Sequence, residues 1–248
     1  MKVAIISINR SASTAVSQLF AQKYSLLNYG EVFLDNNNRV SVDVKQSERP
    51  HSAYITELLQ TSPNFVCKLM ISAFIPTQTQ PKLITYSAGT DYSSFDFSIF
   101  DKLIFTQRAV VDQIASILSV NTVFSSQIKP QKDSISSKDR TVLYENYTGP
   151  VDISDSVFNG LEKQFDLYRE IKAFLYAKYP EKCGTVSYEM LQQEPALAMS
   201  QFSDAVQLPF TATDYLVLTT QKTNKDYKSA MTNYAEMVAQ IEKYNLHY

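Results

Sequence analysis

Short apolar runs alternate along the chain with longer segments in which apolar residues recur every three or four positions. Runs such as VAIISI at residues 3–8 are typical of strands buried on both faces of a parallel sheet. They predict strands at residues 2–8, 25–33, 65–71, 82–86, 101–106 and 184–188. The helical spacing predicts helices at about residues 14–23, 53–60, 108–120, 155–179, 196–206 and 228–244.

Strands that alternate with helices predict parallel βαβ units with right-handed crossovers. We therefore expect an α/β protein with three α/β/α layers around a central, mostly parallel sheet. In such sheets, ligands bind beyond the carboxyl ends of the strands. Candidate functional residues are accordingly expected in the turns that follow the predicted strands.

The segment 125–155 differs from its surroundings because it is rich in Ser, Lys, Asp and Gln, and Pro130 and Pro150 interrupt it. The strand and helix pattern resumes after it, which favours a surface insertion or lid over a linker between two domains. We therefore expect residues 1–248 to form a single domain with a lid at 125–155. The length of 248 residues and the 44% hydrophobic content agree with one mid-sized domain.

The charge balance restricts the possible partners. Lys and Arg number 23 and Asp and Glu number 25, which gives a net charge of -2. A chain without a positive field is not expected to hold nucleic acid, so any phosphate site has to be local. With only 5 glycines, neither GxGxxG nor GxxxxGK[ST] can be written anywhere in the sequence, which excludes glycine-dependent phosphate loops.

The two cysteines, Cys67 and Cys183, stand far apart and form no CxxC or Cys/His cluster. This argues against a disulfide scaffold and against structural zinc, so no metal is expected. No uncharged apolar stretch reaches the roughly 18 residues that a membrane span requires, and the first residues lack the pattern of a secretion signal. We expect a protein that acts in the cytoplasm.

The segment Asn9-Arg10-Ser11-Ala12-Ser13-Thr14-Ala15 lies where the first predicted strand turns into the first predicted helix. A helix start offers unpaired backbone N–H groups and the positive end of the helix dipole, and hydroxyl side chains add further donors. Arg10 adds a permanent cation that can bind phosphate through two parallel hydrogen bonds. An ordinary serine-rich helix cap is the alternative interpretation, and this segment alone does not exclude it.

A second group follows the predicted strand at 101–106. Arg108, Asp112 and Ser116 are spaced by four residues, which places them along one side of a predicted helix. Arg108 is expected to bend back over Ser116, so that the pair holds a second phosphate. A solvated helix face with Asp112 as a surface charge is the alternative.

Together, these segments resemble the sulfotransferases that use 3'-phosphoadenosine 5'-phosphosulfate (PAPS). Arg10-Ser11-Ala12-Ser13-Thr14 is similar to the family's Lys/Arg-Ser-Gly-Ser/Thr-Thr loop, which binds the 5'-phosphosulfate. Arg108 and Ser116 are similar to the Arg and Ser, eight residues apart, that bind the 3'-phosphate. Ser187-Tyr188-Glu189-Met190-Leu191, followed by Pro195, looks like the Tyr-Glu-x-Leu segment, in which the Tyr lies near the nucleotide.

Within the family, the pattern is closest to the Stf-zero type bacterial carbohydrate sulfotransferases. The shared features are a Glu-x-Phe after the second strand, a strand with Lys-Leu-Met, and a Gln-Ala-x-Ser helix. The corresponding segments are Glu31-Val32-Phe33, Cys67-Lys68-Leu69-Met70 and, loosely, Gln113-Ile114-Ala115-Ser116. The resemblance implies a P-loop NTPase-like sulfotransferase fold, PAPS as donor and 3'-phosphoadenosine 5'-phosphate (PAP) as product, and no metal.

The resemblance also implies site roles. The implied nucleotide-binding residues are Arg10, Ser11, Ala12, Ser13, Thr14, Ala15, Arg108, Ser116 and Tyr188. Glu31 is the implied general base, and Arg10 and Lys68 would stabilise charge on the departing phosphate. The expected acceptor is a hydroxyl of a carbohydrate or another small metabolite.

Three alternatives remain open from the sequence. Glu31 can be a solvated turn residue, and Lys68 a strand-end lysine that reaches solvent. The chain can also be a non-catalytic nucleotide-binding protein of the same fold, because Ala12 replaces the usual glycine and is expected to deny the loop an easy left-handed residue. A kinase is disfavoured, since neither a Lys-Ser/Thr loop nor an acidic strand end for magnesium is found.

Overall fold

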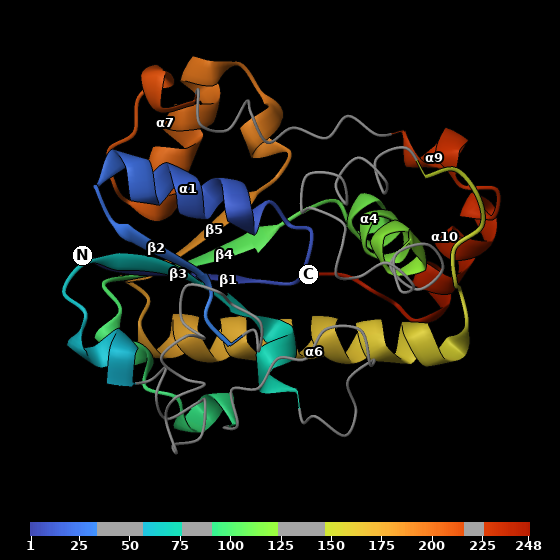
Figure 1. Ribbon diagram of the computed structural model, residues 1–248, viewed down its shortest axis with the longest axis horizontal. Helices are drawn as coiled ribbons and strands as arrows, with labels where there is room; N and C mark the ends of the chain where they lie inside the picture. Colours follow the sequence, from blue (N-terminus) through green and yellow to red (C-terminus); the bar gives the residue numbers. More distant parts are fainter. Residues whose placement is uncertain (34–56, 76–90, 124–146, 216–225) are drawn as a thin grey trace, which may run out of the picture.

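The computed structural model describes residues 1–33, 57–75, 91–123, 147–215 and 226–248 (Figure 1). Its sheet is parallel throughout and has the order β2-β3-β1-β4-β5. The strands are β1 (Lys2–Ser7), β2 (Leu27–Glu31), β3 (Phe65–Met70), β4 (Lys102–Gln107) and β5 (Cys183–Ser187). Five of the six predicted strands are thus confirmed, and the strand predicted at 82–86 lies outside the described residues.

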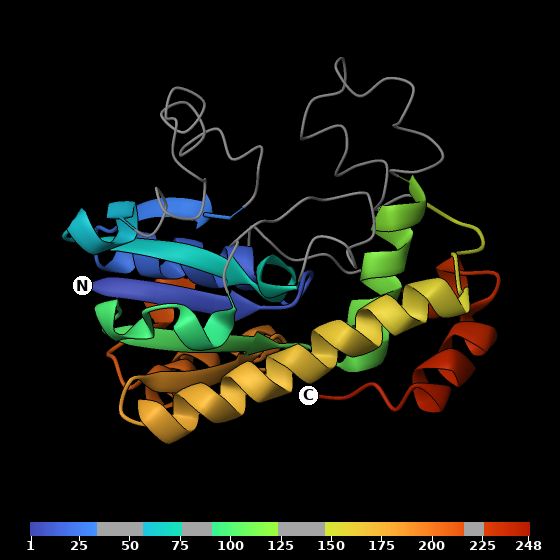
Figure 2. The ribbon, with the colours of Figure 1, turned by 90° about the horizontal axis from the view of Figure 1, so that it is seen from below.

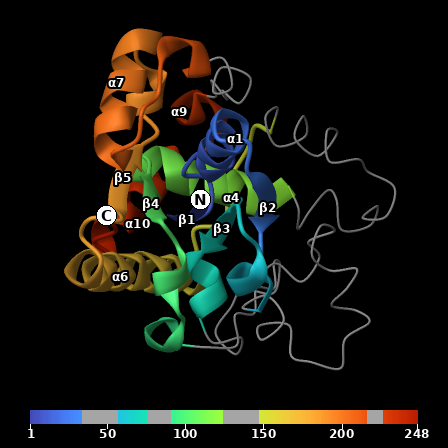
Figure 3. The same cartoon turned by 90° about the vertical axis from the view of Figure 1, so that its left-hand side faces the viewer.

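Helices cover both faces of the sheet, which confirms the predicted α/β class with three layers. In Figure 1, α1 (Ser13–Lys23) and α7 (Pro195–Val206) lie on one face, and α6 (Asp155–Lys178) crosses the other. The view along the sheet in Figure 3 shows the same separation. Beyond the carboxyl ends of the strands lie α4 (Val110–Val123), α9 (Tyr227–Ala230) and α10 (Tyr234–Lys243), as Figures 1 and 2 both show.

Five shorter helical turns complete the assignment. They are the 3-10 turns η1 (Ile71–Phe74), η3 (Tyr92–Ser94), η4 (Phe97–Ile99), η7 (Met190–Gln192) and η8 (Ala212–Tyr215). Residues 57–61 are also helical and include the described part of the helix predicted at 53–60. The predicted lid at 125–155 lies mostly outside the described residues, since the structure describes it only from residue 147.

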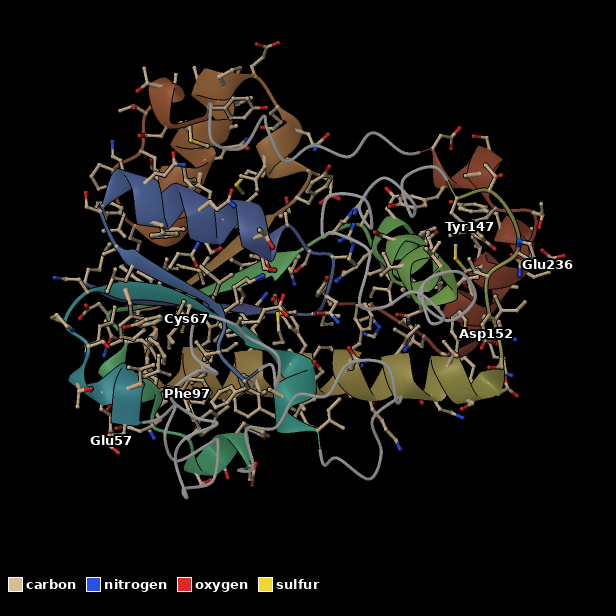
Figure 4. All side chains as sticks on the ribbon, viewed as in Figure 1. Glu57, Cys67, Phe97, Tyr147, Asp152 and Glu236 are labelled. Atoms are coloured by element: carbon tan, nitrogen blue, oxygen red, sulfur yellow. The ribbon has the colours of Figure 1, made fainter. Side chains whose placement is uncertain are left out.

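The core is divided by the sheet, because successive residues of a buried strand point to opposite faces. Val3 and Ile5 of β1 pack toward α1 and α7, whereas Ala4 and Ile6 pack toward α6. The α6 side is rich in aromatic rings. Figure 4 labels Cys67 and Phe97, which both belong to this cluster.

The long helix α6 follows the predicted apolar stripe. Its buried residues are Phe158, Leu161, Phe165, Tyr168, Ile171 and Leu175. The helix ends at Lys178, shortly before Pro180, whose ring cannot continue a helix. Tyr168 carries the only hydroxyl in this stripe, and it donates a hydrogen bond to the carbonyl oxygen of Thr106 at 3.2 Å. The stripe therefore ties α6 to β4 near the carboxyl end of that strand.

The prediction of one last helix at 228–244 is wrong, because the segment forms two helices, α9 and α10. Met231 between them is extended, with φ -97° and ψ 122°, and forms a parallel bridge to Gly149. The Asn233 side chain holds both the N–H and the carbonyl oxygen of Val151. Pairing with the segment that precedes α6 thus interrupts the helix, and Tyr147, Asp152 and Glu236 of this region are labelled in Figure 4.

The start of α4 also differs from the prediction of a helix at 108–120. The helix begins at Val110, so Arg108 lies in the turn between β4 and α4. Arg108 and Ser116 therefore do not share a helix face as the spacing of four residues predicted. Asp112 is exposed in the first turn of α4, which agrees with its interpretation as a surface charge.

Candidate functional site

The strand order creates a switch point between β1 and β4. From β1 the chain moves outward to β2 and β3, and it then returns to the other side of β1 to form β4 and β5. A crevice beyond the carboxyl ends of the strands at such a point is the usual ligand site of an open α/β sheet. Arg10 follows β1 and Arg108 follows β4, so the two predicted arginines lie in adjacent turns at this point.

The loop after β1 contains two non-glycine residues with left-handed backbone. Arg10 has φ 67° and Ala12 has φ 65°, which costs about 1–2 kcal/mol for each residue. Ala12 thus adopts the left-handed conformation, but at a steric cost, which agrees with the expectation that it denies the loop an easy left-handed residue. Ala12 is the N-cap of α1, and its side chain cannot accept a hydrogen bond. The N–H groups of the first helical turn therefore receive no cap from this residue.

The loop's hydroxyl groups do not all face a ligand. Ser11 is buried, and its hydroxyl donates to the carbonyl oxygen of Ile8 at 2.7 Å and lies 2.7 Å from the Thr106 hydroxyl. Ser11 therefore ties the loop to β4, which corrects its predicted role as a hydroxyl donor to phosphate. Ser13 is buried and Ala15 packs into the core between α1 and the sheet, whereas Thr14 is exposed at the helix start.

Lys68 joins the loop to the second strand. Its ammonium lies 2.9 Å from Oε1 of Glu31 and 3.1 Å from Oγ1 of Thr14. Glu31 and Lys68 are register partners in β2 and β3, so the ion pair follows directly from the strand pairing. Lys68 is only 7% exposed, which is inconsistent with a strand-end lysine that reaches solvent. A buried ammonium requires anionic partners, and here the Glu31 carboxylate is one of them.

Ser116 accepts a hydrogen bond from Arg10 rather than from Arg108. The Arg10 Nε donates a hydrogen bond to the Ser116 Oγ at 3.0 Å, and Ser116 is buried in α4. The predicted pairing of Arg108 with Ser116 is therefore replaced by a contact between the loop after β1 and α4. The spacing of eight residues did not predict the contact correctly, because Arg108 lies before the first residue of α4 and not on the helix. The contact brings residues of the two predicted phosphate-binding groups together.

Arg108 lies against two aromatic rings. Its guanidinium carbon is 4.5 Å from the ring centroid of Tyr188 and 5.9 Å from that of Tyr227. The side chain is only 8% exposed, and its buried Nε has no hydrogen-bond partner in the described part of the chain. Buried donors are nearly always paired, so this N–H calls for an acceptor such as a phosphate oxygen. Sequence reasoning missed Tyr227, whose place depends on the break between α9 and α10.

The helix start of α4 is occupied by protein groups. Glu189 accepts a hydrogen bond from the N–H of Ala109 at 2.7 Å. The Tyr248 hydroxyl is in contact with the N–H of Arg108. Any anion beside this turn would therefore be held by side chains rather than by these two N–H groups. Sequence reasoning assigned no role to Glu189, although the Tyr-Glu pair after β5 had already drawn attention to this position.

No three His, Cys, Asp or Glu side chains in the described part of the chain gather closely enough to hold a metal ion. Within the same residues, no helix combines the length and apolar character of a membrane span.

No protein-family model matches the chain, and no curated protein matches its sequence. A solved structure that is similar to it is that of retinol dehydratase in complex with androsterone and inactive cofactor PAP. That similarity covers 98% of this chain and 79% of the other, with a TM-score of 0.46 and 12% sequence identity. Because the similarity is this weak, the site residues have to be judged by their own geometry.

Proposed function

We propose that the protein is a sulfotransferase that moves the sulfuryl group of PAPS to a hydroxyl of a carbohydrate or another small metabolite. One observation carries the proposal. Two arginines follow adjacent parallel strands at the switch point of the sheet, and an ion pair between the buried Lys68 and the partly exposed Glu31 lies at the neighbouring strand ends. This arrangement offers cations for a doubly charged donor and a carboxylate for an acceptor proton.

The donor would be held at both of its anionic ends. The first N–H groups of α1, together with Arg10, Thr14 and Lys68, suit the 5'-phosphosulfate, since a helix start and two cations favour negative charge. The unpaired Arg108 Nε suits the 3'-phosphate. Ser116 accepts from Arg10, and a hydroxyl that accepts a hydrogen bond still has its own proton to donate to that phosphate.

The acceptor would be activated by Glu31. As the acceptor oxygen bonds to sulfur, the bond from sulfur to the bridging oxygen breaks, the acceptor proton passes to the Glu31 carboxylate, and PAP leaves. Lys68 contacts both Glu31 and Thr14, so it would hold the carboxylate in place and also stabilise charge on the departing phosphate. No metal takes part in this scheme.

Two measurements test the proposal. Calorimetry should detect PAP binding to the wild-type protein, and transfer of labelled sulfate from PAPS should be found with at least one member of a panel of sugars and small alcohols. Glu31→Gln keeps the size of the side chain but removes the base, so transfer should fall by about 10²- to 10⁴-fold while PAP affinity stays the same. If calorimetry detects no binding of PAP to the wild-type protein, the proposal is overturned.

Two further outcomes separate catalysis from nucleotide binding alone. If PAP binds but no acceptor is sulfated, the protein binds the nucleotide without transfer. If Glu31→Gln instead leaves the transfer rate unchanged, Glu31 is not the base. The first of these results would favour the non-catalytic nucleotide-binding protein. Asp101→Asn is the matched control, because this exposed carboxylate lies at the opposite, amino end of β4 and should affect neither quantity.

A further inference from the structure

A fully buried amide in α4 connects the two arginine-bearing turns. The Gln113 side chain is 0% exposed. Its Nε2 donates to the carbonyl oxygen of Asn9, the residue before Arg10, at 2.7 Å. Its Oε1 accepts a hydrogen bond from the Tyr248 hydroxyl. Both ends of the amide are thus in use, one toward the loop after β1 and the other toward Tyr248.

Tyr248 extends this connection to the second turn. Its hydroxyl also lies beside the backbone of Arg108. The ring is fixed edge-on against Phe165 and Tyr168 of α6, with centroid distances of 5.2 Å and 5.1 Å. Burial raises the pKa of the Tyr248 hydroxyl well above its usual value, so the phenol keeps the proton that it donates to Gln113.

The hydrogen bonds run in one direction without a mismatch. The Tyr248 O–H donates to Gln113, and the Gln113 amide N–H donates to Asn9. The orientation of the amide is therefore determined, because the Asn9 carbonyl can only accept, so the amide N–H must face it. An apolar residue at position 113 would leave two buried polar groups without partners.

We propose that Gln113 is a positioning residue that, with Tyr248, sets the spacing between the Arg10 and Arg108 turns. The proposal rests on the function proposed above. A ligand with two phosphates depends on the separation of the two turns, whereas a ligand with one phosphate does not. A positioning role therefore predicts a selective loss of PAP binding, and a purely structural role predicts an equal loss for PAP and AMP.

The test is calorimetry with PAP and with AMP, at a temperature where circular dichroism shows each variant fully folded. Gln113→Leu should weaken PAP binding about tenfold or more and AMP binding less than about threefold. Gln113→Glu keeps the acceptor for Tyr248 but places an oxygen against the Asn9 carbonyl, and it should show the same selectivity. Tyr248→Phe removes the central hydroxyl and should weaken PAP binding by about three- to tenfold.

Tyr215→Phe is the matched control. This buried tyrosine donates its hydroxyl to the carbonyl oxygens of Leu191 and Gln193, in the α7 part of the core. Its loss should lower the melting temperature without changing the ratio of AMP to PAP dissociation constants. Two variants cover the case in which Gln113→Leu fails to fold, since Gln113→Glu and Tyr248→Phe carry the same prediction.

The outcomes separate the two proposals. If the wild-type protein prefers PAP over AMP and the variants keep the same preference, the positioning role is wrong and the proposed function stands. If the wild-type protein does not bind PAP, both proposals fall.

Discussion

Arg10 and Arg108 occupy comparable places in neighbouring βα units, but different forces hold them. Arg10 has a strained left-handed backbone, is partly exposed, and donates its Nε to Ser116. Arg108 is buried against Tyr188, and its Nε has no hydrogen-bond partner within the described ranges. The local backbone conformation thus fixes the position of Arg10, whereas packing against residues distant in sequence fixes the position of Arg108. The second therefore depends more strongly on a ligand to complete its hydrogen bonding.

The largest expected effect comes from Arg108→Met, which removes the guanidinium but keeps an unbranched apolar side chain. PAP affinity should fall roughly ten- to hundredfold, because a charge-assisted hydrogen bond contributes about 1.5–3 kcal/mol. AMP, which lacks the 3'-phosphate, should bind almost as before. Calorimetry with the two nucleotides measures both effects.

The control for this change is Lys23→Met, which removes one positive charge from a partly buried pair with Asp214. It should alter neither affinity by more than about twofold, since Lys23 is the last residue of α1 and lies at the end away from the Arg10 loop. Equal losses of PAP and AMP affinity in Arg108→Met would contradict a specific role at the 3'-phosphate.

Arg10→Met should weaken binding of both nucleotides without selectivity and thus sharpen the comparison. Both PAP and AMP carry a 5'-phosphate, so both should bind about tenfold more weakly. Titrations of the two nucleotides against this variant decide the point. A loss confined to PAP would move Arg10 to the 3'-phosphate, where its contact with Ser116 would then be the reason.

The aromatic support of Arg108 has a smaller expected effect. Tyr188→Leu removes the ring 4.5 Å from the guanidinium and should weaken PAP binding about two- to fivefold, since a cation–π contact is worth about 0.5–1 kcal/mol. Tyr188→Phe retains the ring and should show the smaller loss of the two. If the two variants weaken PAP equally, the hydroxyl rather than the ring supports the site.

The strain in the Arg10 loop predicts the smallest change and one of opposite sign. Ala12→Gly should stabilise the protein by about 0.5–1 kcal/mol, because glycine adopts φ 65° without the Cβ penalty while losing more backbone entropy on folding. Scanning calorimetry should show a melting temperature about 1–4 °C higher.

The matched control is Ala15→Gly, three residues further in α1. Ala15 lies within the helix and is buried, so glycine there should destabilise the protein by about 1 kcal/mol. A destabilising Ala12→Gly would show that the left-handed backbone at this position is not strained.

The strands and the long helix could be predicted because local patterns encode them. Continuous apolar runs define β1 and β3, and the stripe from Phe158 to Leu175 defines the buried face of α6. The two-part end of the chain could not be predicted, because the bridge between Gly149 and Met231 joins segments far apart in sequence.

The candidate site was predictable only in part for the same reason. Turns after strands indicated Arg10 and Arg108, and an ammonium in an apolar strand indicated Lys68. The partners of these residues depend on tertiary packing. Ser116 accepts a hydrogen bond from Arg10, and Arg108 is contacted by Tyr227 of α9 and by Tyr248, which follows α10. No spacing rule contains this information.

The central claim is that one adenosine bisphosphate lies across the switch point with one phosphate beside each arginine turn. A crystal structure with PAP bound measures this directly. The account predicts the 5'-phosphate at the start of α1 and the 3'-phosphate within hydrogen-bond distance of the Arg108 Nε. A nucleotide bound elsewhere, or with its 3'-phosphate remote from Arg108, would contradict it.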